Sequence, residues 1–473
     1  MLKKAILLAC LFVIVSLPTA CSPDDVSGKQ QDNNQLPVLK VYYVESGAGT
    51  DYHIDQMERA TVNYIVNYPG KCKIERTVFK SDQYEQYRST LATDLLTGQG
   101  PDILFIEDET FPSIRKVMAS GVFCDLNELI EKDREFDLSD YNKTIMDSGV
   151  YKGKRYLVPW YYELPVLMTV KSVTDGNDIS TGRVGTWDGL MGEAEKFAGF
   201  GEKDARYFLV GDFKFSDIVE SCGNLFVDYD KKKTGFDSGE FIRLLEIYKE
   251  LHSVQYSAKI GKDLKTRLGV GPAEDNLSVF GVSKFYSSPF RFELANSEAL
   301  YFYKEDLLLY PFPSFRQNDG INVVPACFLA INAKCKNKEA AFDFIKIVLS
   351  EKEQSMWEYE DGTLHVAMGL PVNNKALDTT LELFSRDMYL RNQNNDIGIP
   401  SVDQTFHLPE SSISREQTGM LKSLVGGIGS SCIIDKTILD MLDQEIQDFL
   451  KGRKTAKQTA RLMDNKATLF LNE

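Results

Sequence analysis

The stretch of sequence that decides the fold is Tyr84–Phe105, YEQYRSTLATDLLTGQGPDILF. Its first half carries an apolar stripe at helical spacing, which predicts a helix with one buried face: Tyr84, Tyr87, Leu91 and Leu95. Gly98 then ends the helix, Pro101 prevents its continuation, and Ile103–Ile106 reads as a short buried strand. A helix that returns the chain to an apolar strand is typical of an α/β protein with a mainly parallel sheet.

The same alternation continues on both sides of this stretch. Upstream, the pattern predicts a buried strand at Val38–Val44, a helix over Ile54–Tyr68 and a strand over Cys72–Val78. Downstream, we expect helices after Thr186 and Ser238, strands near 277–280, 307–312 and 328–331, and helices at 339–349, 434–450 and 455–470. The β-α-β-α-β order at the start predicts parallel strands with helices on both faces.

The chain is long and acidic. Its 473 residues exceed the roughly 250–300 at which a single core stops growing, so at least two cores are expected. The hydrophobic share of 43% and the charged share of 26% are ordinary for a globular protein. The net charge of −15 disfavours nucleic acid and anionic lipid headgroups as partners.

The N-terminus has the pattern of a secretory signal peptide. Lys3-Lys4 is followed by the apolar run Ala5–Leu17, which is too short to span a membrane, and Thr19-Ala20 precedes Cys21. This ending resembles a bacterial lipobox, which implies removal of residues 1–20 and attachment of a diacylglyceryl group to Cys21. The leucine usually found three places before the cysteine is replaced by Pro18, so cleavage after residue 20 without lipid is the alternative.

Cysteine and histidine usage shows no catalytic or metal-binding pattern. The six cysteines beyond residue 21 form no CxxC pair and lie mostly in apolar contexts, so we expect buried thiols rather than disulfides: Cys72, Cys124, Cys222, Cys327, Cys335 and Cys432. The four histidines form no HExxH motif, and neither a Gly-x-Ser-x-Gly elbow nor a phosphate-binding loop occurs. We therefore expect no enzyme activity, no cofactor and no metal.

Several phrases of the sequence resemble one family. In chain order they are Gly98–Ile103 (GQGPDI), Gly121–Leu129 (GVFCDLNEL), Gly153–Pro159 (GKRYLVP), Tyr310–Pro313 (YPFP), Leu329–Ile347 (LAINAKCKNKEAAFDFIKI), Gly369–Asn373 (GLPVN) and the tail Gly452–Glu473. Each phrase is weak alone, but their order and their coverage from about residue 38 to 473 are similar to the extracellular solute-binding proteins of bacterial ATP-driven importers. The resemblance is to the sugar-binding group that includes maltose-binding protein.

The resemblance implies a two-lobed fold of the periplasmic-binding-protein type (type II), in which each lobe is a mainly parallel sheet flanked by helices and hinge strands join the lobes. The implied division is a signal peptide at 1–20, a lipidated cysteine and flexible tether at 21–37, a first lobe at 38–160 and 331–380, and a second lobe at 161–330 and 381–473. The resemblance also implies a monomer at the extracellular face of the cell membrane, anchored by lipid as in Gram-positive bacteria. Its expected partners are a small-molecule solute, a mono- or oligosaccharide, and the permease subunits of an ABC importer.

Ligands of open α/β sheets bind beyond the carboxyl ends of the strands, and this rule selects two loops. Glu45 follows the first strand, and Glu107 and Asp108 follow the strand Ile103–Ile106. Carboxylates at these places are able to accept hydrogen bonds from sugar hydroxyls, although loop acids are often merely solvated. The resemblance favours Asp108, because the family often places a polar contact just after this strand.

The predicted crossover between the lobes is Pro159–Pro165, PWYYELP. Strand alternation turns Trp160 and Tyr162 to one face and Tyr161 and Glu163 to the other. Because an aromatic face suits the apolar face of a sugar ring, we take Trp160, Tyr162 and Glu163 as candidate ligand contacts, with packing at the hinge as the alternative.

Two more aromatic residues are candidates. Phe285 and Tyr286 follow an expected strand, where relatives often place an aromatic platform, although this segment lacks their usual Gly-x-Trp pattern. Three functions remain open from the sequence: a binding module for a sugar importer, a binding module for another solute or for a sensor, and a secreted glycoside hydrolase. Two carboxyl groups about 5–9.5 Å apart across a cleft would distinguish the hydrolase.

Overall fold

The computed structural model describes residues 36–45, 52–107, 109–197, 207–210, 213–254, 278–285, 292, 296, 299–300, 303–355, 357–358, 364–365, 369–384 and 413–473. The chain from Pro37 to Glu473 forms one compact unit. Cys21, Asp108 and Tyr286 lie outside the described residues. Within the described part of the chain, no helix has the length and apolar character needed to cross a membrane.

Ten strands of the described residues form one sheet, whose main path runs β2-β1-β3-β12-β6-β10-β7. These strands are β1 (Val38–Val44), β2 (Lys73–Phe79), β3 (Ile103–Ile106), β6 (Val158–Thr169), β7 (Tyr207–Val210), β10 (Ser278–Phe285) and β12 (Ile321–Ile331). Three short strands join at the side, namely β11 (Leu308–Pro311), β15 (Leu370–Pro371) and β16 (Ile428–Ser431). Pairing is parallel at both ends of the path and antiparallel where β6 and β12 run through its middle.

The helix and strand predicted from Tyr84–Phe105 are present. Helix α2 (Tyr84–Leu96) buries Tyr87, Leu91 and Leu95, and all four residues of β3 are buried. Gly98 takes a φ of +72°, a left-handed conformation that ends helices readily only when the residue is glycine. The local sequence therefore builds the helix–turn–strand unit as expected.

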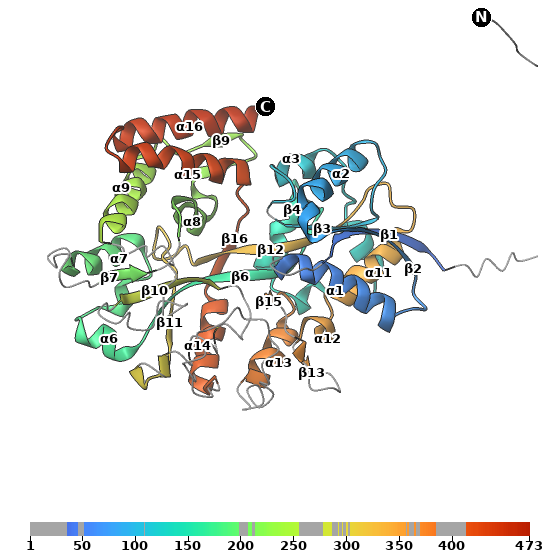
Figure 1. Cartoon of the computed structure of the whole chain (residues 1–473), viewed down its shortest axis with the longest axis horizontal. Coiled ribbons are helices and arrows are strands. Elements are labelled where there is room, and N and C mark those ends of the chain that lie inside the picture. The colour runs from blue at the N-terminus through green and yellow to red at the C-terminus, as the bar shows by residue number, and fades with distance from the viewer. Residues whose placement is uncertain are drawn as a thin grey trace, which may run out of the picture. The chain divides into compact units, whose positions relative to one another are not determined.

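The first lobe, as we use the term, comprises the elements around β1, β2 and β3. Its helices are α1 (Tyr52–Asn67), α2, α3 (Ile114–Ala119), α4 (Asn127–Lys132), α5 (Lys143–Met146), α11 (Lys338–Val348), α12 (Glu351–Gln354) and α13 (Asn374–Phe384). Side chains of β3 alternate between two cores: Ile103 and Phe105 enter one, Leu104 and Ile106 the other. Helices lie on both faces of the strands (Figure 1), and buried side chains of α1 and α2 belong to the first and the second of these cores.

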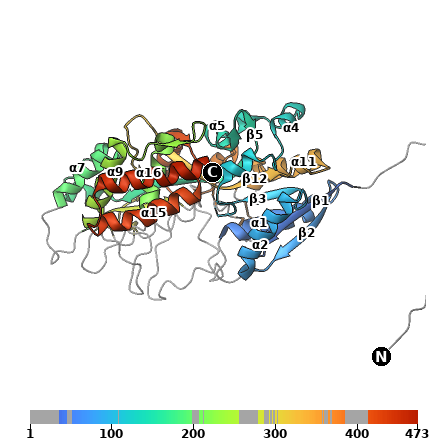
Figure 2. The same cartoon turned by 90° about the horizontal axis from the view of Figure 1, so that it is seen from above.

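The second lobe comprises the elements around β7, β10 and β11. Its helices are α6 (Lys171–Gly176), α7 (Trp187–Ala194), α8 (Phe215–Ser221), α9 (Gly239–Val254), α14 (Arg415–Gly426), α15 (Lys436–Leu450) and α16 (Ala456–Asn472). Helices α15 and α16 lie side by side, with α15 against α8 and α16 against α9 (Figure 2). Trp187 is 1% exposed and its Nε1 donates to Ser221 Oγ at 3.1 Å, which fits a structural role at the start of α7.

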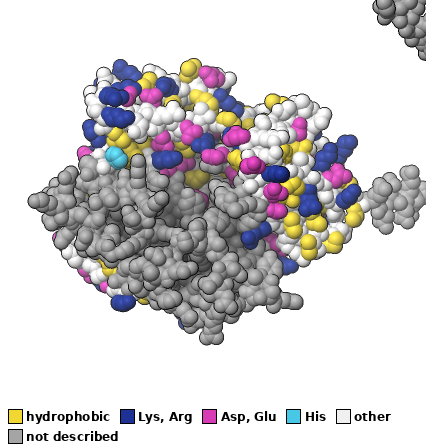
Figure 3. Space-filling model, in the orientation of Figure 1, with side chains coloured by type: hydrophobic (Ala, Val, Ile, Leu, Met, Phe, Trp, Pro, Cys, Tyr) yellow, Lys and Arg dark blue, Asp and Glu magenta, His cyan; other side chains and the backbone are white. Residues whose placement is uncertain are grey.

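The six internal cysteines are free thiols in the structure, five of them buried and Cys124 half-buried. Burial raises the pKa of the Cys222 thiol to about 12, so this group stays protonated at neutral pH. On the described part of the face drawn in Figure 3, acidic and basic side chains are interspersed.

Candidate functional site

The carboxyl ends of two parallel strands meet at one edge of the first lobe. Strands β1 and β3 are hydrogen-bonded neighbours, with Val41 opposite Ile103. The loops that leave them begin at Glu45 and Glu107, as the sequence predicted. Glu45 is half-buried, and its backbone N–H donates to the Phe79 carbonyl at 2.8 Å, which fixes the point where the chain leaves β1.

Glu107 is held in place from several directions. Its carboxylate Oε2 accepts a hydrogen bond from Tyr84 Oη at 3.0 Å, and its backbone N–H donates to Thr110 Oγ1 at 2.9 Å. Burial, and then the nearby Glu107 carboxylate, raise the pKa of both Tyr84 and Tyr87 above the ordinary tyrosine value. The strand end therefore carries a fixed carboxylate flanked by neutral tyrosines.

Trp160 lies on β6 inside a cluster of aromatic rings. Its ring centroid is 5.6 Å from that of Phe105 and 4.7 Å from that of Tyr161, and the residue is 6% exposed. Its backbone carbonyl accepts a hydrogen bond from Gln354 Nε2. A sugar ring would contact the indole in this arrangement only at its small exposed edge.

Tyr162 and Glu163 follow on the same strand. Tyr162 is 0% exposed, its hydroxyl has no hydrogen-bond partner among the described residues, and burial raises its pKa. Glu163 is half-buried and lies opposite Val324 of β12. Phe285 is the last residue of β10 and lies opposite Leu164, so its backbone is brought next to this segment; its side chain is outside the described residues.

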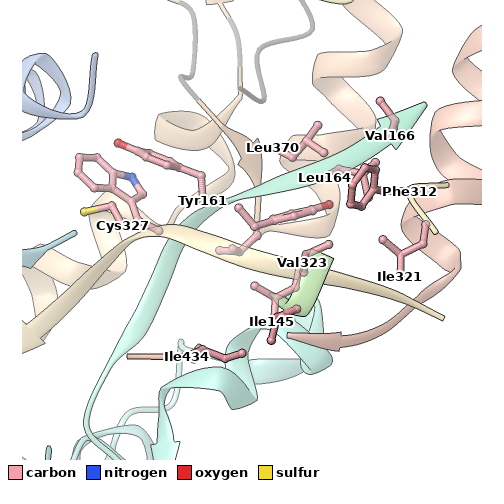
Figure 4. Close-up of a cluster of buried hydrophobic side chains, with 14 of the residues drawn as sticks. Ile145, Tyr161, Leu164, Val166, Phe312, Ile321, Val323, Cys327, Leu370 and Ile434 are labelled. Carbon is pink, nitrogen blue, oxygen red and sulfur yellow. The ribbon is translucent and has the colours of Figure 1, made fainter. Parts of the chain in front are cut away.

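The two crossing strands are irregular where these residues lie. β12 shifts register on both sides of Cys327, at the level of Tyr161 and Tyr162 on β6. Pro325 also provides no backbone N–H for the ladder. Figure 4 shows the side chains packed here, among them Tyr161, Cys327, Leu370 and Val323, which come from β6, β15 and β12. Bulges and prolines interrupt the ladder, so fewer backbone hydrogen bonds join β6 to β12 at this level.

The structure therefore brings Glu45, Glu107 and the segment Trp160–Glu163 to the region where β1, β3, β12 and β6 adjoin. One hydrogen bond that the structure shows here was not predicted from the sequence. Ser113, the N-cap of α3, bonds to Asp435, the residue before α15, across a separation of 322 residues. No local pattern predicts a contact over that separation.

A separate cavity of about 580 Å³ lies in the second lobe. Its lining includes Arg183, Thr186, Ser314 and Ser423, but none of the predicted ligand contacts. Thr186 Oγ1 already accepts from Gly189 N–H, Ser314 Oγ donates to the Arg316 carbonyl, and Arg183 pairs with Glu193 at 3.3 Å. These bonds use part of the hydrogen-bonding capacity of the lining, and none of the predicted ligand contacts lies there, so we favour the strand ends as the site.

Comparison with known proteins decides the family. The family model described as bacterial extracellular solute-binding protein matches residues 68–355, more than half of the chain. The chain is a bacterial extracellular solute-binding protein. The matched residues include β3, β6 and β12, the three strands that position Glu107 and the crossing segment.

Individual relatives of this solute-binding protein are distant. The diacetylchitobiose-binding protein DasA of Streptomyces coelicolor is 23% identical over 389 residues, which cover 80% of this chain and 84% of DasA. Among solved structures, the sugar-binding protein MalE of Xanthomonas citri is similar with a TM-score of 0.62 at 12% identity, covering 92% and 97% of the two chains. The substrate-binding protein Lmo0181 of Listeria monocytogenes, solved with cycloalternan, has a TM-score of 0.57 at 16% identity and covers 93% and 100%.

The structural neighbours place this solute-binding protein in the two-lobed type II fold, as the sequence predicted. Among the residues that the structure describes, no group of three or more His, Cys, Asp or Glu side chains is arranged to hold a metal ion.

Proposed function

We propose that this solute-binding protein captures a carbohydrate outside the cell and delivers it to an ABC importer, without catalysing a reaction on it. The observation that carries the proposal is the family match over residues 68–355, which spans the end of β3 and the crossing segment. Proteins of similar sequence or fold that bind diacetylchitobiose and cycloalternan support a carbohydrate as the solute class.

We further propose that the solute binds beyond the carboxyl ends of β1 and β3. Glu45, Glu107 and Asp108 would accept hydrogen bonds from its hydroxyls, because carboxylates are strong acceptors. Trp160, Tyr162, Glu163, Phe285 and Tyr286 form the proposed crossing side of the site. Trp160 and Tyr162 are nearly inaccessible in the present arrangement, so their direct contact with a solute requires the packing around them to rearrange.

We also propose the lobe division expected from the sequence, 38–160 with 331–380 and 161–330 with 381–473. The contacts of α15 with α8 and of α16 with α9 support the assignment of the C-terminal helices to the second lobe. A lipid on Cys21 would hold the protein at the extracellular face of the membrane as a monomer, and residues 22–37 would serve as its tether. Two acyl chains give stable anchoring, whereas one gives only marginal binding.

The deciding experiment is a thermal-shift screen against mono- and oligosaccharides, followed by calorimetry with those that bind. A sugar at 100 times its dissociation constant should stabilise the protein by about 2.7 kcal/mol. Glu107→Gln keeps an acceptor oxygen for the Tyr84 hydroxyl and removes the charge, so it should lower affinity with little change in stability. Binding of amino acids, peptides or polyamines in place of sugars, or release of shortened sugars on incubation, would contradict the proposal.

A further inference from the structure

A group of contacts joins the two lobes beside the proposed site. Ser113 Oγ donates to Asp435 Oδ2 at 2.7 Å, and Thr437 Oγ1 donates to the carbonyl of residue 112 at 3.0 Å. The guanidinium carbon of Arg115 lies 5.2 Å from the centroid of the Tyr229 ring. We call the set Ser113, Arg115, Tyr229, Asp435 and Thr437 the α3–α15 junction.

The two sides of the α3–α15 junction are fixed to different lobes. Ser113 caps α3, and the adjoining Ile114 and Met118 are buried in the first-lobe core with Leu104 and Ile106. On the other side, Asp435 leads into α15, which packs on α8 and α16 of the second lobe. Tyr229 follows β8 (Val227–Asp228), and its Oη accepts the backbone N–H of Asp435 at 2.8 Å. A movement of one lobe relative to the other therefore strains the contacts that cross the junction, which are Ser113 to Asp435, Thr437 to the carbonyl of residue 112 and Arg115 to Tyr229.

The carboxyl group of Asp435 contributes both favourable and unfavourable free energy to the α3–α15 junction. The residue is 2% exposed, and its Oδ1 has no hydrogen-bond partner among the described residues. Burial raises the pKa of this carboxyl, while the Ser113 hydroxyl and the backbone and charge of Arg115 act in the opposite direction. Separation of the lobes returns the carboxylate to water, so the favourable contacts of the junction oppose a desolvation cost.

Two further pairs of side chains join the lobes beside the α3–α15 junction. Lys116 Nζ lies 4.1 Å from the centroid of the Phe470 ring, and Lys436 Nζ lies 3.9 Å from Glu109 Oε1. Glu109 and Thr110 belong to the loop that leaves β3, the strand whose end carries Glu107. The junction is thus continuous with the loop that we expect to contact the solute.

We propose that the α3–α15 junction is a latch that holds the lobes together beside the solute site and opens to release the solute. The inference rests on the proposed function for its purpose, but the latch itself is a property of the solute-free protein. Because attraction and desolvation oppose each other in the junction, its strength stays low enough for solute binding to shift the equilibrium between open and closed lobes. Loss of the Asp435 contacts should lower the closed-to-open ratio about tenfold, which corresponds to about 1.4 kcal/mol.

The test is small-angle X-ray scattering on the solute-free full chain and three variants. Asp435→Ala removes the acceptor and should increase the radius of gyration. Asp435→Asn keeps an oxygen for the Ser113 hydroxyl and removes the buried charge, so it should remain at least as compact as the wild type. Asp448→Ala is the matched control on the same helix, because the Asp448 carboxylate pairs with Arg453 at 3.3 Å and with Lys454 at 3.2 Å, both of which belong to the second lobe. Thermal unfolding by circular dichroism verifies that each variant is folded.

Expansion of Asp435→Ala alone supports the latch. Scattering of Asp435→Ala that superimposes on that of the wild type overturns it, and so does equal expansion of Asp448→Ala or of Asp435→Asn. These measurements use no sugar, so a failed sugar screen would reject the proposed function and leave the latch to be judged by its own result.

Discussion

Gly369→Ala tests whether the crossing strands are packed as tightly as the structure indicates. Gly369 is buried just before β15, which pairs with β6 at Tyr161 and Tyr162. A Cβ atom at Gly369 would lie 2.2 Å from the Cβ and 2.6 Å from the Cγ of Tyr161. Rotation of the Tyr161 side chain does not move its own Cβ, so the contact is relieved only by main-chain displacement between β15 and β6.

The expected cost follows from this geometry. Overpacking a well-packed core typically costs 1–3 kcal/mol, and a clash with an atom fixed by the backbone belongs at the upper end, so we expect about 3 kcal/mol. Urea unfolding followed by circular dichroism measures the loss as a lower midpoint with an unchanged slope.

Gly419→Ala is the matched control for Gly369→Ala. Gly419 lies exposed within α14, with no neighbouring atom within 4 Å of its would-be Cβ. The change should stabilise the protein by about 0.5–1 kcal/mol, because alanine loses less conformational freedom in a helix. If Gly369→Ala unfolds at the midpoint of the wild type, the close approach of β15 to Tyr161 is refuted.

Three further changes have defined outcomes. Trp160→Ala should lower the free energy of unfolding by about 3–5 kcal/mol, because it leaves a cavity at a buried site. If a sugar covers roughly 80–100 Å² of the indole, the same change should also weaken sugar binding by about 30–70-fold. Unchanged affinity by calorimetry would assign this residue to packing. Because the pKa of Asp435 is raised in the latched protein, the latch should be strongest below that pKa and weaken as pH rises through it. In small-angle X-ray scattering, the radius of gyration of the wild type should therefore grow with pH, and that of Asp435→Asn should stay constant. The charged groups that act on this carboxyl are Arg115 and Lys116; Tyr229 accepts the backbone N–H of Asp435, and the adjoining Lys436 pairs with Glu109. Membrane-extracted protein should begin at Cys21 and carry the mass of a diacylglyceryl group, and a mature form with a free Cys21 thiol would contradict lipidation.

The positions of the predicted ligand contacts show how far sequence reasoning reached. The rule that ligands lie beyond strand ends selected Glu45 and Glu107, and in the structure Glu45 follows β1 and Glu107 follows β3. The pattern that selected Trp160 could not reveal its exposure, because the Phe105 ring that packs against it comes from β3, a separate segment of the chain. Whether these residues bind the solute stays a prediction.

The sequence by itself determined the type and order of the elements. Helical stripes such as Tyr87, Leu91 and Leu95, apolar runs such as Ile103–Ile106 and terminators such as Gly98 act through neighbours a few residues away, so they can be read locally. The short motifs that resemble the solute-binding family predicted the two-lobed fold in the same way, because each motif specifies local structure and the motifs follow one another in the order found in the family.

Only the tertiary structure decided which distant segments meet. The pairing of β6 with β12, the approach of Gly369 to Tyr161 and the bond from Ser113 to Asp435 all join residues that are far apart in the chain. Such contacts depend on how whole elements pack. The sequence gives the residue type of an aspartate or a tryptophan, but it does not say whether another segment of the chain buries that side chain. The burial that makes Asp435 a latch and Trp160 a packed ring is therefore a property of the assembled lobes, not of any stretch of sequence.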